Sequence, residues 1–192
     1  MVRKKRVIEV KKRFSLLLII IISMATLIIS MGIMYYFSSQ NGIISSQQSN
    51  IVIEIVDKIR EEIVLEDERL ISIKEKLFSI LKNIGSEEYL IRKGAHILIY
   101  TSIGIAMASF IYILSRKVFI SSYLAYILAT MYACYDEYRQ LSIEGREGSF
   151  QDILIDSMGA LVGIWIFIFI VGIFNIIRKI NKKEEYTIIN HK

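Results

Sequence analysis

Long apolar runs separated by short polar segments dominate the chain. Four of these runs come close to or exceed the roughly 20 residues that a helical membrane crossing requires. They are residues 14–37, 94–114, 118–135 and 153–177. The second and third runs would also fit a buried soluble hairpin, but the basic turn Ser115-Arg116-Lys117 between them suits a membrane surface. The pattern predicts an all-α polytopic membrane protein with four transmembrane helices, and a composition that is 54% hydrophobic agrees.

The segment between the first two runs, residues 38–91, has a soluble character. From Asn50 to Ile84, apolar residues recur at a spacing of three or four, interrupted at Glu66, and charged residues of both signs fill the opposite face. This pattern predicts one or two amphipathic helices. They either cap the outer ends of the spans or lie among lipid headgroups. A partner-binding coiled coil would need more uninterrupted heptads.

Basic residues predict the orientation of the chain, because short cytoplasmic loops retain Lys and Arg. Residues 1–13 hold seven basic residues against the single acid Glu9, and the tail at residues 178–192 is rich in lysine. Both termini are therefore expected in the cytoplasm, with the helical insertion outside a multi-pass plasma-membrane protein. The net charge of +5 then belongs to helix flanks that meet anionic lipid, which argues against a nucleic-acid partner.

Two other features of the chain narrow the interpretation. The first apolar run is longer than a signal-peptide core, and Ser38-Ser39-Gln40 offers no clear cleavage site, so we expect a retained anchor. Cys134 is the only cysteine, so an internal disulfide is excluded and redox chemistry is not expected.

Polar residues gather at the ends of the last three runs. Ser86-Glu87-Glu88 predicts a capped helix start before the second run. Residues four apart share a helix face, which applies to three pairs: His96 and Tyr100, Asp136 and Gln140, Asp152 and Asp156. The predicted topology puts all three pairs at the outer membrane face. Because ionisable groups inside membrane segments are costly, we expect a shared functional pocket there.

Taken together, these motifs resemble the VanZ-like membrane proteins, whose founding members are associated with resistance to the lipoglycopeptide teicoplanin. The motifs span roughly residues 37–163. They are Phe37-Ser38-Ser39-Gln40-Asn41-Gly42 with Ser45 and Ser49, Arg92-Lys93-Gly94-Ala95-His96 with Tyr100, Tyr135-Asp136-Glu137-Tyr138-Arg139-Gln140, Gly145-Arg146-Glu147-Gly148-Ser149, and Asp152 with Asp156, Gly159 and Gly163. The resemblance implies a three-helix region at residues 92–177 that carries the polar site.

Two positions depart from the pattern of that family. Arg139 stands where a histidine usually follows Asp-Glu, which weakens any mechanism that needs a second imidazole. Glu144 stands where a proline usually precedes Gly-Arg, which makes the turn less rigid and adds a negative charge beside Arg146.

Structural roles compete with functional ones at these positions. Arg92 and Lys93 would snorkel at a helix end, Asp152 would cap a helix with Ser149 as the alternative, and Arg139 and Arg146 would neutralise the acids. Asp156 lies one turn inside an apolar run and most needs a buried partner. Gly159 and Gly163 predict a close-packed helix face.

Three kinds of chemistry remain open for the site. Divalent metal binding lacks a recognisable ligand spacing, so no metal or cofactor is expected. Acid–base catalysis would use His96, Asp136, Glu137 and Asp156. Recognition of a charged headgroup would use the remaining candidates Arg92, Lys93, Tyr100, Arg139, Gln140, Arg146 and Asp152.

Three functions follow, in order of preference. The first is a protein of the bacterial cell envelope that binds or shields an amphiphile, such as a membrane lipid, a lipid-linked envelope component or a lipoglycopeptide antibiotic. The second is an intramembrane enzyme that acts on a lipid-linked envelope precursor. A transporter ranks third, because four spans form a pathway only in an oligomer and no acid lies near mid-membrane. The oligomeric state stays open.

Overall fold

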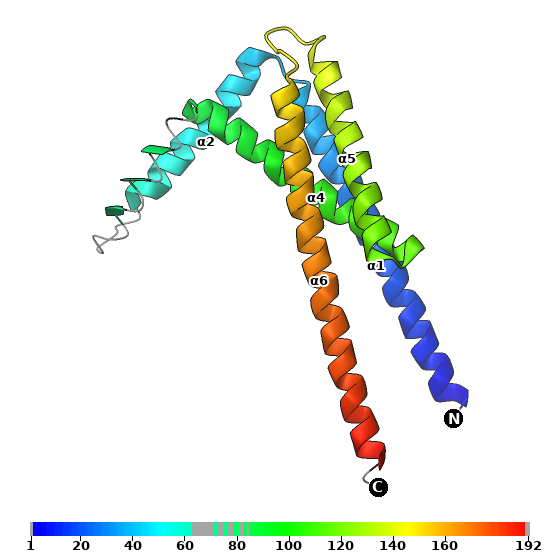
Figure 1. The fold of residues 1–192 in the computed structure, drawn as a ribbon. Helices are drawn as coiled ribbons and strands as arrows, with labels where there is room; N and C mark the ends of the chain where they lie inside the picture. The colour runs from blue at the N-terminus through cyan, green and yellow to red at the C-terminus, as the bar shows by residue number, and fades with distance from the viewer. Residues whose placement is uncertain are drawn as a thin grey trace.

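The computed structural model describes residues 2–62, 71–72, 75–76, 79–80, 83 and 85–190. Its named elements are five helices (Figure 1). They are α1 (Val2–Ser38), α2 (Gly42–Glu62), α4 (Glu87–Ser115), α5 (Val118–Gln140) and α6 (Phe150–Asn190). The predicted interruption of the amphipathic segment at Glu66 lies outside the described residues.

Four of these helices are long and apolar enough to cross a membrane. The candidate spans are Leu17–Ser38, Glu87–Ser115, Val118–Gln140 and Phe150–Asn181. The prediction of an all-α polytopic membrane protein with four spans is confirmed, including the third span, whose predicted apolar run was the shortest. The second span starts at Glu87, ahead of its apolar run, because the hydroxyl of Ser86 accepts a hydrogen bond from the Tyr89 amide at 3.3 Å.

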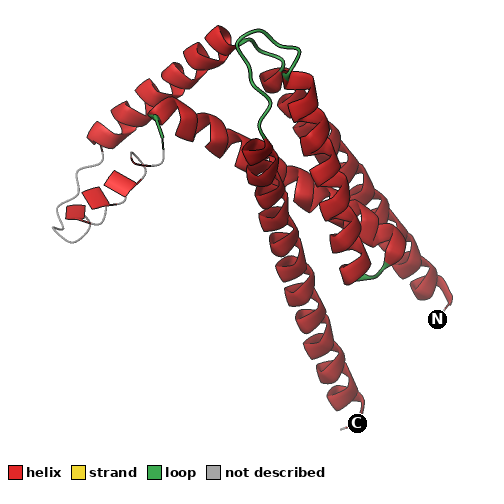
Figure 2. Cartoon of the chain, turned by 45° about the horizontal axis from the view of Figure 1, so that its top comes forward, coloured by secondary structure: helices red, strands yellow, loops and turns green. Residues whose placement is uncertain are grey.

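Helix α4 lies at the centre of the bundle and packs against α1, α5 and α6. The two chain termini and the α4–α5 turn lie toward one end, whereas the α1–α2 connection and the α5–α6 loop lie at the other (Figures 1 and 2). We call the second of these the loop end. The two described chain ends thus lie at the same end of the bundle, and their cytoplasmic location stays a prediction.

Small residues allow α4 and α6 to approach closely. A Cβ atom on Gly159 would lie 2.8 Å from the carbonyl oxygen of Ile97, and one on Gly163 would collide with the backbone at Thr101. The Thr101 hydroxyl donates a hydrogen bond to the Gly159 carbonyl at 3.0 Å. The predicted close-packed face is therefore confirmed, and its partner is α4.

Helix α2 differs from the expected insertion in its start and in its position. It begins at Gly42, eight residues before Asn50, because the side chain of Asn41 accepts a hydrogen bond from the Ile44 amide at 2.9 Å. It runs beside the beginning of α4 and away from the bundle (Figures 1 and 2). The hydroxyl of Ser46 on α2 donates a hydrogen bond to the Glu88 carboxylate in the first turn of α4 at 2.8 Å. Helix α2 does not lie across the ends of all the spans as a cap would. The exposed Ile51, Ile55 and Ile59 favour the headgroup alternative.

Candidate functional site

The site lies at the loop end, where α4, α5 and α6 converge beneath the loop that joins α5 to α6. Gly145 in this loop has a φ of +72°, a conformation that glycine adopts readily. The Gly42 amide donates to the carbonyl of Glu144 at 3.3 Å, so the loop is fastened to the start of α2. The glycine therefore serves as a turn residue, as the sequence predicted first.

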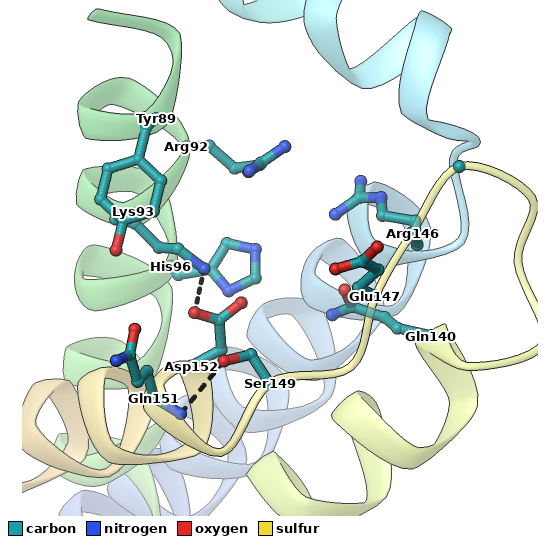
Figure 3. A pocket seen from close by; sticks show the side chains of 11 residues that line it. Tyr89, Arg92, Lys93, His96, Gln140, Arg146, Glu147, Ser149, Gln151 and Asp152 are labelled. Carbon is teal, nitrogen blue, oxygen red and sulfur yellow. Dashed lines mark hydrogen bonds and ion pairs between the residues drawn. The ribbon is translucent and has the colours of Figure 1, made fainter. Parts of the chain in front are cut away.

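A polar pocket of about 570 Å³ opens between the loop, α4 and the start of α6 (Figure 3). Its lining includes six of the residues predicted from sequence and five others. The predicted residues are Arg92, Lys93, His96, Gln140, Arg146 and Asp152. The others are Tyr89, Gly145, Glu147, Ser149 and Gln151. The expected convergence of three separate chain segments is thus present in the structure.

Lys93 and Asp152 join α4 to α6 at one wall of the pocket. The ammonium group of Lys93 forms an ion pair with Asp152 and lies 5.4 Å from the centre of the Tyr89 ring. Both charged side chains are largely buried, so each depends on the other for compensation. Asp152 lies in the first turn of α6, which starts at Phe150, and the hydroxyl of Ser149 accepts from the Gln151 amide at 3.2 Å. Ser149 is therefore the residue that caps α6, which was the alternative to Asp152.

His96 and Asp156 form a second link between the same helices, one turn deeper. Nδ1 of His96 lies 3.2 Å from Oδ1 of Asp156, and both side chains are almost fully buried. Asp156 thus has the buried partner that its position demands. The second carboxylate oxygen of Asp156 and the hydroxyl of the buried Tyr100 have no hydrogen-bond partner among the described residues. Tyr100 lies outside the lining of the pocket, although we expected it among the binding residues.

Asp136 and Glu137 are buried at the end of α5, where Gln140 holds them in place. The Gln140 amide donates to Asp136 at 3.1 Å and to Glu137 at 3.2 Å. Glu137 also accepts from the Ser149 amide at 3.0 Å, which ties α5 to the start of α6. Ser38 at the end of α1 donates to Asp136 at 2.6 Å. These acids organise the ends of the helices and do not line the pocket.

Arg139 faces the end of α1, away from the pocket. It forms an ion pair with Asp136 at 3.0 Å, donates to the hydroxyls of Ser38 and Ser39, and stacks 3.9 Å from the centre of the Tyr35 ring. It therefore neutralises Asp136, as the structural alternative predicted, and is not placed to bind a ligand in the pocket. No local pattern in the sequence indicated the contacts of Arg139 with α1.

Arg92 and Arg146 are the two arginines of the pocket lining, and neither forms an ion pair with an acid in the described part of the chain. In the described residues, Arg92 has no hydrogen bond or ion pair, and Arg146 donates only to the backbone carbonyls of Gln40 and Phe37, each at 3.1 Å. Arg146 forms no direct ion pair with Asp136, Glu137 or Glu144 in the described part of the chain, although the negative charges of Asp136, Glu137 and Asp152 act on it at longer range. Burial lowers the pKa of the Arg146 guanidinium, and the positive charge of Arg92 lowers it further.

An apolar groove of about 150 Å³ adjoins the polar pocket. It lies between the end of α1, the start of α2 and α4, and its apolar lining comes from Phe37, Val52, Ile91, Ala95 and Ile99. Three residues line both spaces: Arg92, His96 and Arg146. The sequence did not predict this groove, because it depends on how α2 docks beside α4.

Metal binding gains no support from the arrangement of side chains. Within the part of the chain that the structure describes, no group of three or more His, Cys, Asp or Glu side chains is placed to hold a metal ion. The ionisable groups instead form pairs and hydrogen-bonded networks.

A comparison with sequence models of protein families identifies the family of the chain. The sequence model of the VanZ/LLP1 family matches residues 17–174. The chain belongs to the VanZ/LLP1 family. The match begins in α1 and ends in α6, so it covers every residue that lines the polar pocket. No curated protein and no solved structure matches the chain.

Several residues of the site were missed or given no role from the sequence. Tyr89, Glu147 and Gln151 line the pocket, and Ser38 is buried against Asp136. The position of Ser38 at the end of an apolar run was a usable signal, since a polar side chain there needs a partner. Gln151 carried no comparable signal because it lies on an exposed helix turn.

Proposed function

We propose that this VanZ-family protein binds an amphiphile at the outer face of the bacterial plasma membrane. The single observation that carries the proposal is the contact between a polar pocket and an apolar groove, which share Arg92, His96 and Arg146. A molecule with a charged headgroup and an apolar chain matches this pair of spaces, because each part meets a surface of its own polarity.

The pairing of the charged side chains supports a binding role for the pocket over a purely structural one. Lys93, His96 and Arg139 each have an acidic partner, so they hold the helices together. Neither Arg92 nor Arg146 forms an ion pair within the residues that the structure describes, so their guanidinium groups are available to a ligand. The pocket is therefore organised by its own ion pairs before a ligand arrives.

The orientation of the pocket rests on the charge bias of the sequence. The loop end lies opposite the termini, and the basic N-terminal segment favours the cytoplasm. In that orientation the pocket faces the cell surface, where lipid-linked envelope components and lipoglycopeptide antibiotics are found. A teicoplanin-type antibiotic carries an apolar chain on a polar scaffold. Its engagement or shielding by the pocket would lower the accumulation of the antibiotic at the surface and so the susceptibility of the cell.

The antibiotic role is tested by measuring teicoplanin bound to cells. Cells that express the protein are expected to accumulate less teicoplanin at their surface than cells without it. A variant with Ala95→Trp, which fills the apolar groove, should behave like the deletion at equal expression, and the exposed α6 variant Met158→Trp should behave like wild type. Equal binding in all four strains would remove the antibiotic role.

An intramembrane enzyme is the second candidate, and His96 is the observation that favours it. Its ring lines the pocket and is held by the buried carboxylate of Asp156, which is the arrangement that orients a general base. The Asp156→Asn variant keeps a hydrogen-bonding group but removes the charge. If lipid profiles of wild type, this variant and a deletion are the same, the enzymatic alternative fails.

A further inference from the structure

The polar pocket has a chemical preference that follows from its charges. Its cationic lining residues are Arg92, Lys93 and Arg146. Lys93 is neutralised by Asp152, which leaves two guanidinium groups without an acidic partner in the described part of the chain. Of the two acids in the lining, Asp152 is used by Lys93, and Glu147 is exposed and makes no ion pair there. The lining therefore holds the three cations Arg92, Lys93 and Arg146 against two acids, and this excess of positive charge suits an anion.

The two arginines are placed to act on one group. Figure 3 shows their side chains pointing toward one another from opposite walls, Arg92 from α4 and Arg146 from the loop, with His96 beside them. Arg146 is held in place through Nε and Nη2 by the carbonyls of Gln40 and Phe37, so Nη1 is free to donate. Burial lowers the pKa of Arg146, and the positive charge of Arg92 lowers it further, because the two guanidinium groups repel each other. An anion between them would relieve this repulsion.

We propose that Arg92 and Arg146 bind the phosphate group of a phosphorylated lipid whose chain lies in the adjoining apolar groove. A phosphate presents three or more oxygens and up to two negative charges, so it accepts hydrogen bonds from guanidinium groups on two sides at once. A carboxylate has two oxygens, and one arginine fork satisfies both of them. The proposal rests on the amphiphile-binding function and specifies the headgroup.

The dimensions of the two spaces agree with this ligand. The groove, at about 150 Å³, is far smaller than the polar pocket, at about 570 Å³. The groove therefore takes the first part of one chain, and the rest of the chain extends into the bilayer. The pocket exceeds a bare phosphate in volume, so it has room for a group attached to the phosphate.

The test is a binding assay on the full-length protein in detergent, with four single-chain or chain-free probes. They are 1-oleoyl lysophosphatidic acid, 1-oleoylglycerol, oleate and inorganic phosphate. The variants are Arg92→Gln and Arg146→Gln, with Lys58→Gln as the matched control, because Lys58 is an exposed cation on α2 that lines neither space. Arg92→Lys keeps the charge but loses the planar fork. A monodisperse elution profile establishes that each variant is folded.

The expected result is that lysophosphatidic acid binds tightest and that each Arg→Gln variant weakens it by about tenfold or more, since a charge-assisted hydrogen bond is lost. Arg92→Lys should retain an intermediate affinity, and Lys58→Gln should match wild type. The affinity for 1-oleoylglycerol should be lower and should not change among the variants. Inorganic phosphate should compete weakly, because it lacks the chain.

Each contrary outcome overturns a defined part of the account. If lysophosphatidic acid binds equally to wild type and both glutamine variants, the arginine pair is not a phosphate site, while binding of 1-oleoylglycerol would keep the amphiphile proposal. If oleate matches lysophosphatidic acid with the same dependence on the arginines, the headgroup is a carboxylate. If inorganic phosphate competes as well as the lipid, the chain contributes nothing. If none of the three oleoyl probes binds, the proposed function fails as well.

Discussion

His96 on α4 and Asp156 on α6 are hydrogen-bonded at 3.2 Å between Nδ1 and Oδ1, although 60 positions separate them in the chain. Close packing of the two helices makes this contact possible, since Gly159 lies against the backbone of Ile97, one residue beyond His96. The polar site and the glycine face are thus parts of one α4–α6 interface.

The first prediction concerns this close packing. Gly163→Ala should destabilise the protein by about 1–3 kcal/mol, because the new methyl group collides with the backbone at Thr101 and forces the helices apart. Thermal unfolding in detergent measures the effect. Gly172→Ala is the matched control, since nothing lies within 4 Å of the added atom. A loss of equal size in both variants would contradict the packing argument.

The second prediction concerns the buried pair at the end of α5. Arg139→Gln should cost about 3–5 kcal/mol, because the buried Asp136 loses its cation. The double variant Asp136→Asn with Arg139→Gln should recover most of that loss, since no unpaired charge remains. The measurement is a double-mutant cycle of thermal stability.

The exposed Arg116 at the opposite end provides the control for the loss of an arginine. Arg116→Gln should leave stability nearly unchanged. Strictly additive effects of Asp136→Asn and Arg139→Gln would show that the two side chains do not interact.

The third prediction concerns the link between Lys93 and Asp152. Asp152→Ala should destabilise the protein and should also increase its discrimination between anionic and neutral amphiphiles, because the freed ammonium of Lys93 adds a third unpaired positive charge to the pocket. Binding of 1-oleoyl lysophosphatidic acid should therefore strengthen relative to wild type. Weaker binding of the anionic lipid in a folded variant would contradict this account of the pocket's charge.

The fourth prediction concerns orientation. In a Cys134→Ala background, a cysteine placed at Glu147 should react with a membrane-impermeant thiol reagent added outside intact cells, because Glu147 is exposed in the loop. A cysteine at Lys117, in the turn near the opposite end, should react only after the cells are opened. The reverse pattern would place the pocket inside the cell and remove the surface function.

Much of the architecture could be predicted because membrane helices have strong local signals. A run of about 20 apolar residues identifies a span, and the Ser86-Glu87-Glu88 motif located the start of α4 correctly. The pairs at a spacing of four identified the helix faces that converge. The need of Asp156 for a partner followed from its depth alone.

The tertiary contacts could not be predicted from these local patterns. Whether a cation such as Arg139 faces the pocket or the end of α1 depends on the packing of neighbouring helices, which periodicity does not encode. The start of α2 at Gly42 depends on a cap from Asn41, and the added turns before Asn50 contribute Ser45, Gln48 and Ser49 to the groove. The functional distinction between Arg92 and Lys93 likewise required the position of Asp152.

Native mass spectrometry of the full-length protein released from bacterial membranes tests the central claim most directly. The account predicts that wild type and the Met158→Trp control retain an amphiphile as a discrete mass adduct. Ala95→Trp, with the apolar groove filled, should lose that adduct while remaining folded. An adduct that persists unchanged in Ala95→Trp, or wild-type protein that carries none under conditions preserving lipid contacts, would contradict the claim.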